Sequence, residues 1–320
     1  MALHPNLDPE LRAGMEQVPF AAADMALSFE TLAGQRAQMN AMMAAAPAPD
    51  TRVSIENRMV PGPEGEPDVR LRIYRPEEQG EGRPGLYWIH GGGMIIGVPE
   101  IDDAMMIDYV ERLGVVAVSV DYRLAPEHPH PAPVEDCYAG LVWTAKNAAE
   151  LGIDPDRLAV GGASAGGGLA AATVLLARDR GGPGVAFQLL VCPMLDDRNT
   201  TPSSHEFAEA VVWDRSANLF GWSALLGDRA GTDDVPPYAA PARATDLSGL
   251  PPAFVDVGEL EVFRDECLDY ARRLAQAGVS TEFHLYPGAF HGFDIMVPGA
   301  ELSRRAQQAR MSALKRAFRR

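Results

Sequence analysis

A serine set among small residues is the feature of this sequence best suited to chemistry. Residues 162–166 read GASAG, which matches the pattern G-x-S-x-G around Ser164. An apolar run precedes this pattern and a run of glycine and alanine follows it, as in a strand that turns sharply into a helix. At such a turn the hydroxyl lies at a helix N-terminus, where free N–H groups favour negative charge. We therefore predict that Ser164 is a nucleophile, with Gly162 and Gly166 leaving room for the crowded backbone.

Three consecutive glycines follow a histidine at residues 90–93, directly after another apolar run. Acyl transfer at a serine forms a tetrahedral oxyanion, and N–H donors that are already in position stabilise it. An HGGG segment is a known source of such donors when it accompanies G-x-S-x-G. We predict an oxyanion hole formed by the N–H groups of Gly91, Gly92 and Ala165. His90 is expected to brace this segment by hydrogen bonding, and Gly93 to support it.

A serine nucleophile needs a base, and the sequence has seven histidines. His291 follows the last apolar run, in a segment with Pro287 and Gly288 that is typical of a loop. His284 lies within that apolar run and is expected to pack or face solvent. The H-x-H segment at residues 128–130 lies among prolines and lacks a third ligand, so we predict no metal site there. His291 is therefore the predicted base.

The base needs an acid to orient it, and in this chain order the acid lies between the serine and the histidine. Three carboxylates follow the apolar run at 253–258, namely Glu259, Glu261 and Asp265. Asp256 lies inside the run and is expected to belong to a strand. Residue types and spacing alone leave the choice among the three carboxylates open.

These residues must be positioned by regular elements, and apolar runs rich in β-branched or aromatic residues predict eight strands. The runs are at 52–60, 69–75, 85–90, 115–120, 157–162, 187–192, 253–258 and 281–287. Helix-like segments are expected at 101–113, 135–150, 164–180, 263–277 and 300–319. Strands that alternate with helices indicate a mostly parallel sheet, whereas the two closely spaced first runs indicate an antiparallel pair.

Two segments interrupt this alternation and look like helical insertions over one end of the sheet. Residues 1–50 precede the first strand, and residues 197–250 separate the sixth strand from the seventh. We predict an N-terminal cap segment at 1–50 and a cap insertion at 197–250. The catalytic core then comprises residues 51–196 and 251–320.

Composition limits the classes of partner. The formal net charge of −16 disfavours nucleic acid and anionic membrane surfaces and favours small neutral or cationic partners. Three dispersed cysteines, without zinc or disulfide spacing, indicate a reducing compartment. The sequence shows neither a secretory signal nor an apolar run long enough to span a membrane. We expect a cytoplasmic protein that needs no cofactor or metal.

Five segments in order resemble the bacterial hormone-sensitive-lipase-like carboxylesterase family: HGGGMIIG, DYRLAPEHPHPAP, GGASAGGG, VGELEVFRDE and YPGAFHGF. The resemblance covers residues 85–293. It implies an α/β-hydrolase fold, with a mostly parallel eight-stranded sheet flanked by helices and a helical cap. It also implies hydrolysis of small, short-acyl carboxylic esters, often by homodimers.

The resemblance assigns Ser164 as nucleophile and His291 as base, and it favours Glu261 as acid. It also implies that Arg123 and Glu127 are buried supports of the site. The sequence departs from the family where Glu261-Val262 replaces the usual Asp-Pro, and where Ala163 precedes the serine in place of Thr or Asp.

Other activities are compatible with the same residues. A lactonase, an amidase or a deacetylase could use the same triad. A small-molecule receptor on a hydrolase fold is an alternative of a different class, and the presence of His291 argues against it. Turnover of any ester separates the enzyme from the receptor.

Overall fold

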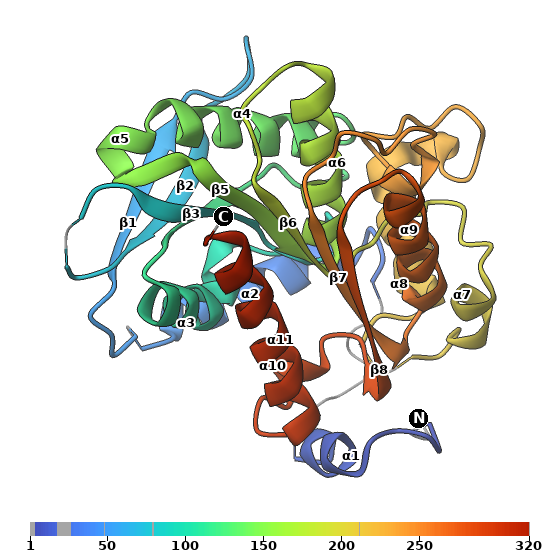
Figure 1. Ribbon diagram of the computed structural model, residues 1–320. Helices are drawn as coiled ribbons and strands as arrows, with labels where there is room; N and C mark the ends of the chain where they lie inside the picture. The colour runs from blue at the N-terminus through green and yellow to red at the C-terminus, as the bar shows by residue number, and fades with distance from the viewer. Residues whose placement is uncertain (1–3, 18–26, 48, 79, 211, 320) are drawn as a thin grey trace.

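The computed structural model describes residues 4–17, 27–47, 49–78, 80–210 and 212–319. A single eight-stranded sheet crosses the described part of the molecule in the order β1-β2-β4-β3-β5-β6-β7-β8 (Figure 1). The strands are β1 (Ser54–Val60), β2 (Val69–Arg75), β3 (Arg83–Ile89), β4 (Val116–Asp121), β5 (Ile153–Ala163), β6 (Phe187–Val191), β7 (Ala253–Leu260) and β8 (Thr281–Phe290). β2 pairs antiparallel with β1 and β4, and all other pairs are parallel. The predicted mostly parallel sheet and its antiparallel first pair are confirmed.

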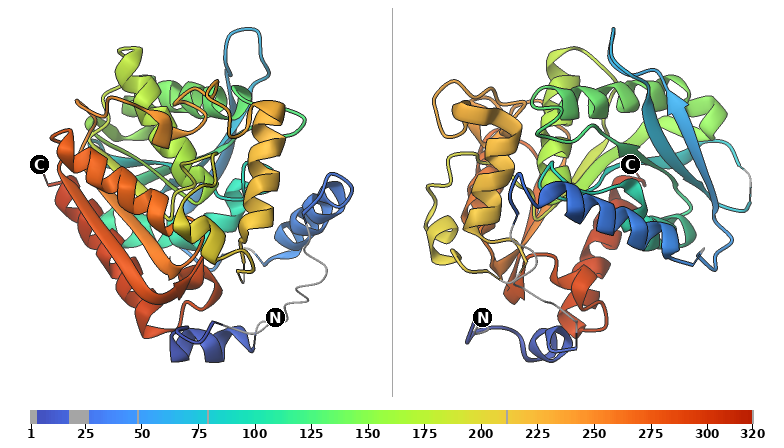
Figure 2. Two further views of the ribbon diagram at one scale, coloured as in Figure 1. Left: turned by 90° about the vertical axis from the view of Figure 1, so that its right-hand side faces the viewer. Right: turned by 180° about the vertical axis from the view of Figure 1, so that it is seen from behind.

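Helices cover both faces of the sheet, which explains why the central strands are almost continuously apolar. One face is covered by α3 (Asp103–Leu113) and α11 (Glu301–Ala317), and the other by α4 (Ala132–Lys146), α6 (Ala165–Asp179) and α9 (Arg264–Gln276) (Figures 1 and 2). All five residues of β6 are buried, as are the last five of β3. The sheet is therefore a rigid base for the loops at its carboxyl edge.

Further helices lie in the two segments that interrupt the strand–helix alternation. The N-terminal segment contains α1 (Pro9–Met15) and α2 (Leu32–Ala45), and the segment after β6 contains α7 (Pro202–Glu206) and α8 (Arg215–Leu226). The short helices α5 (Ala148–Leu151) and α10 (Phe293–Met296) precede β5 and α11. No helix in the described ranges is long and apolar enough to cross a membrane.

The helix α2 stands apart from the sheet, and Arg36 connects it to the core. Of its 14 residues, only Leu32 is buried. The Arg36 guanidinium donates to the carbonyl of Ile95 at 2.6 Å and to the carbonyl of Ala125 at 2.5 Å, and it pairs with Glu127 at 2.8 Å. These contacts join the N-terminal segment to the loop that follows the HGGG sequence and to the loop that follows β4.

The prediction that Glu127 is buried is wrong. Its side chain is 56% exposed and contacts Arg36, which itself comes from the N-terminal segment. Arg123 is mostly buried and donates to both carboxylate oxygens of Asp136, each at 2.8 Å. The motif therefore supports the core through Arg123, whereas Glu127 binds the N-terminal segment.

Candidate active site

Four predicted site residues, and one cysteine that was not predicted, directly follow the ends of neighbouring strands. His90 follows β3, Ser164 follows β5, Cys192 follows β6, Glu261 follows β7 and His291 follows β8. These five strands are parallel and adjacent in the sheet. Their carboxyl ends therefore meet along one edge, which is where sheets of this kind bind ligands.

Ser164 occupies the sharp turn between β5 and α6. Its backbone has φ 57° and ψ −121°, a left-handed conformation that is strained for a residue with a side chain. The neighbouring glycines permit this turn. A Cβ atom at Gly162 would lie 2.2 Å from the carbonyl oxygen of Gly166, and one at Gly166 would lie 2.0 Å from that of Ile89. The G-x-S-x-G pattern thus meets a steric need that glycine alone satisfies.

The structure brings Ser164, His291 and Glu261 into one hydrogen-bonded chain. His291 Nε2 lies 3.0 Å from Ser164 Oγ, and His291 Nδ1 lies 2.5 Å from Glu261 Oε2. The other carboxylate oxygen of Glu261 accepts a hydrogen bond from the amide of Gly258 at 2.7 Å. All three side chains are buried, and Glu261 is only 1% exposed. This is the arrangement of nucleophile, base and orienting acid.

The two other candidate acids have different partners. A carboxylate oxygen of Glu259 accepts from the amide of Gly288 at 2.7 Å. Asp265 accepts from the amide of Ser203 at 2.7 Å and pairs with Arg264. Of the three carboxylates left open by the spacing, Glu261 is the one that the structure brings to His291.

The neighbours of His291 determine the pKa of its imidazole. Burial opposes protonation of the imidazole, but Cys192 and the Glu261 carboxylate outweigh it and raise the pKa of His291 well above its ordinary value. The edge of the Phe263 ring also packs on the imidazole, with centroids 5.2 Å apart. The imidazolium that would form during catalysis is therefore stabilised by its neighbours.

His90 is enclosed behind the glycines and does not contact Ser164 through any described hydrogen bond. Its Nδ1 donates to the carbonyl of Gly91 at 2.8 Å, and its ring stacks on that of Tyr122 with centroids 4.3 Å apart. The Tyr122 hydroxyl donates to the His90 carbonyl at 3.0 Å. Burial lowers the pKa of His90, so the ring is neutral at pH 7. These contacts fit the predicted bracing role.

The glycine segment approaches Ser164 closely. A Cβ atom at Gly91 would lie 3.4 Å from the Cβ of Ser164, and one at Gly92 would lie 1.7 Å from the carbonyl oxygen of Ile96. Gly92 also has φ 115°, in the region that favours glycine. Ala165 is the first residue of α6, so its N–H has no acceptor within the helix.

Sequence reasoning missed Trp213, from the segment after β6. A Cβ atom at Gly93 would lie 2.2 Å from the indole ring, so the third glycine of HGGG makes room for this side chain. The indole N–H donates to Asn218 at 3.1 Å, and Asn218 in turn donates to Asn199. The spacing gave no signal for this contact, because 120 residues separate the two partners along the chain (213 − 93 = 120).

A buried ionic cluster beneath the site was also missed. Arg310 of α11 donates to Asp256 of β7 at 2.6 Å and pairs with Asp294 of α10. All three are at least 95% buried. Arg310 lies on the buried face of α11, a helix with several other arginines.

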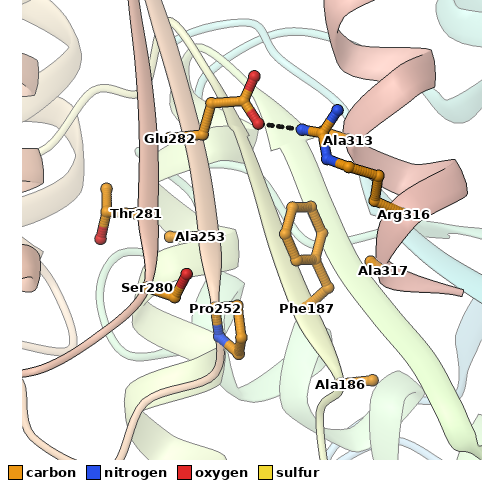
Figure 3. Close-up of a pocket in the computed structure, with 10 residues that line it drawn as sticks. All are labelled: Ala186, Phe187, Pro252, Ala253, Ser280, Thr281, Glu282, Ala313, Arg316 and Ala317. Atoms are coloured by element: carbon orange, nitrogen blue, oxygen red, sulfur yellow. Dashed lines mark hydrogen bonds and ion pairs between the residues drawn. The ribbon is translucent and has the colours of Figure 1, made fainter. Parts of the chain in front are cut away.

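A separate cavity of about 120 Å³ lies at the opposite edge of the sheet (Figure 3). It is lined by the first residues of three strands, Phe187, Ala253 and Thr281, and by the end of α11. Its charged lining residues, Glu282 and Arg316, pair with each other. Because it lies at the amino ends of the strands, this cavity is remote from Ser164.

The described residues contain one group of three side chains that could hold a metal ion. Ligand atoms of Cys192, Glu261 and His291 all lie within 4.8 Å of one another. The sequence predicted no metal site, because it has no zinc spacing of cysteine and histidine. The group overlaps the Ser164–His291–Glu261 chain, so it is not a separate centre.

Comparison with known proteins identifies the family. Residues 86–295 match the sequence profile of a family with the α/β-hydrolase fold. The carboxylesterase NlhH of Mycobacterium tuberculosis is 38% identical, over 98% of this chain and 97% of its own. The chain belongs to the hormone-sensitive-lipase-like carboxylesterase family. The resemblance noted from the five sequence segments is thereby confirmed.

Other members of the carboxylesterase family agree with this assignment. The structure of a bacterial heroin esterase is 44% identical, covers 99% of each chain and superposes with a TM-score of 0.92. An ethyl acetate hydrolase of Pseudomonas putida is 31% identical over 70% of each chain. The α/β-hydrolase fold and membership among carboxylic-ester hydrolases rest above all on NlhH and the heroin esterase, which both span nearly the whole chain.

Proposed function

We propose that this carboxylesterase-family enzyme hydrolyses small, short-acyl esters through an acyl-enzyme on Ser164. One observation carries the proposal: the Ser164 hydroxyl lies 3.0 Å from a buried imidazole whose other nitrogen lies 2.5 Å from Glu261. A serine becomes a nucleophile when an oriented base accepts its proton, and this chain of contacts meets that need.

In the proposed mechanism, His291 Nε2 takes the proton from Ser164 Oγ as the oxygen attacks the ester carbonyl carbon. The resulting oxyanion accepts hydrogen bonds from the amides of Gly91, Gly92 and Ala165. The intermediate then collapses, and the imidazolium gives its proton to the departing alcohol. A water molecule, deprotonated by His291, next attacks the acyl-enzyme and releases the carboxylic acid.

Glu261 has two tasks in this mechanism. It accepts the Nδ1–H of His291, which keeps the Nε2 lone pair directed at Ser164. Its negative charge also stabilises the imidazolium that forms when the proton moves. The second hydrogen bond, from the amide of Gly258, holds the carboxylate in this orientation.

The cap segments at 1–50 and 197–250 are proposed to bound the substrate pocket over the core at 51–196 and 251–320. Trp213 supports this, because its buried indole packs directly on Gly93 of the oxyanion segment. A large rigid ring at that point limits the room beside the reacting carbonyl. The ethyl acetate hydrolase among the relatives acts, by its name, on an ester with a two-carbon acyl group, which also favours short acyl chains.

Covalent labelling tests the nucleophile. A fluorophosphonate probe should label the wild-type protein once and fail to label Ser164→Ala. Ser280→Ala is a matched control, since Ser280 is exposed beside the remote cavity, and it should be labelled like wild type. Stoichiometric labelling of Ser164→Ala at another serine would overturn the assignment.

Initial rates test the substrate class. We expect the kcat/KM for p-nitrophenyl esters to be highest between about two and six acyl carbons, with palmitate far below butyrate. The panel should include an amide and a lactone, because an amidase or lactonase could use the same three residues. Faster turnover of either one than of butyrate would show that ester hydrolysis is not the main activity.

A further inference from the structure

We propose that Cys192, together with His291 and Glu261, binds a soft divalent cation such as Zn²⁺ or Cd²⁺ and that this binding switches the enzyme off. The inhibitory effect rests on the proposed function, whereas the binding itself does not. The ligand atoms of the three side chains all lie within 4.8 Å of one another. They provide a sulfur, a nitrogen and an oxygen, a set that zinc accepts in proteins.

The proposed mechanism makes no use of Cys192, yet this side chain lies against the reacting histidine. It directly follows β6, and its amide donates to the carbonyl of Asp256 in β7 at 2.8 Å, which fixes its backbone. Its side chain contributes to the raised pKa of His291. Cys192 and His291 keep 8% and 7% of their surface exposed, so neither is completely sealed from solvent.

The dimensions of the group fit a metal site after a small adjustment. Ligands bound at about 2.0–2.3 Å to a tetrahedral ion lie roughly 3.3–3.6 Å from one another. The present separations of up to 4.8 Å therefore require side-chain movements of about 1 Å. A water molecule can complete the fourth position.

The charges of the metal ion and its proposed ligands balance in the bound state. A cysteine binds a metal ion as the thiolate, so a thiol must lose its proton when the ion binds. Binding of the ion releases this proton to solvent and leaves a thiolate. The thiolate and the Glu261 carboxylate then balance the two positive charges of the ion. A buried site with no net charge avoids the desolvation cost of an unpaired ion.

Binding would remove the base by either nitrogen of His291. If the ion binds Nδ1, the neutral imidazole carries its proton on Nε2 and can no longer accept the proton of Ser164. If the ion binds Nε2, it occupies the lone pair itself. The ion also takes the Glu261 oxygen that orients the ring. Inhibition should therefore lower kcat toward zero instead of raising KM alone.

The test is a titration of the purified full-length protein with CdCl₂ or ZnCl₂. Ester hydrolysis and the ultraviolet absorption of the cadmium–thiolate bond are both measured. We expect inhibition that EDTA reverses and that CaCl₂ does not cause. Each variant is compared with its own metal-free rate, and Cys192→Ser should require at least tenfold more metal than wild type for half-inhibition.

Two variants separate the causes of failure. Cys137→Ser is the matched control, since Cys137 is also buried but lies away from His291, and it should respond like wild type. Ser164→Ala should be inactive and still give the cadmium–thiolate band, so that binding is measured even if the proposed reaction is wrong. The proposal would be overturned if neither wild type nor Ser164→Ala gives the cadmium–thiolate band. It would also be overturned if the band and the inhibition both persist unchanged in Cys192→Ser and Cys192→Ala.

Discussion

Replacing Glu261 by glutamine keeps the shape of the side chain but removes its charge and one hydrogen-bond acceptor. In the structure, one oxygen of Glu261 accepts from His291 at 2.5 Å and the other accepts from the amide of Gly258 at 2.7 Å. Glutamine has a single acceptor oxygen, so it satisfies only one of the two donors. If that donor is the Gly258 amide, the glutamine NH₂ faces His291.

That arrangement favours the wrong form of the base. A neutral His291 then accepts from the glutamine through Nδ1 and carries its proton on Nε2, where it cannot take the proton of Ser164. The related acid-to-amide change in serine proteases lowers kcat about 10⁴-fold. We expect Glu261→Gln to lower kcat by two to four decades, or about 2.7–5.4 kcal/mol of transition-state stabilisation. Glu261→Asp keeps the charge with a shorter reach and should retain partial activity.

The assay is steady-state hydrolysis of p-nitrophenyl butyrate, with circular dichroism to show that each variant is folded. Glu259→Gln and Asp265→Asn are the matched controls, because these carboxylates lie in the same stretch but bind Gly288 and Ser203 instead. Both should keep most of the wild-type kcat. Near-wild-type activity in Glu261→Gln, with a folded but inactive Glu259→Gln or Asp265→Asn, would show that Glu261 is not the acid.

Three further predictions concern the base, the oxyanion segment and the core. Glu261 helps to raise the pKa of His291, and the base must be neutral, so kcat/KM should fall as pH decreases through a midpoint above 6.5. The residual activity of Glu261→Gln should have a lower midpoint, and equal midpoints in the two proteins would contradict this. Gly92→Ala places a Cβ atom 1.7 Å from the Ile96 carbonyl oxygen and should lower kcat by about 10²–10³-fold. A Gly92→Ala variant with the kcat of wild type would exclude Gly92 from the oxyanion hole. Arg310→Met leaves two buried carboxylates unpaired and should lower the unfolding free energy by about 3–5 kcal/mol in urea titrations, whereas an unchanged midpoint would contradict this reasoning.

Sequence alone determined the parts of the protein that depend on local rules. The strand runs and helical segments follow from apolar periodicity, and they predicted an eight-stranded, mostly parallel sheet with an antiparallel first pair. The G-x-S-x-G pattern predicted the turn at Ser164, since neighbouring backbone atoms exclude any side chain at Gly162 and Gly166. Such rules act over a few residues, and so a sequence pattern expresses them fully.

The tertiary structure decided everything that depends on contacts between distant segments. Residue types and spacing left three carboxylates in seven residues as plausible acids, and the resemblance favoured Glu261. The path of the chain after β7 is what brings Glu261 to His291. The resemblance placed Glu127 inside the protein, whereas α2 draws it to the surface through Arg36. The contact of Trp213 with Gly93 and the proximity of Cys192 to His291 had no sequence signal at all. Each of these contacts depends on side-chain direction at the ends of different elements, and spacing along the chain does not encode that direction.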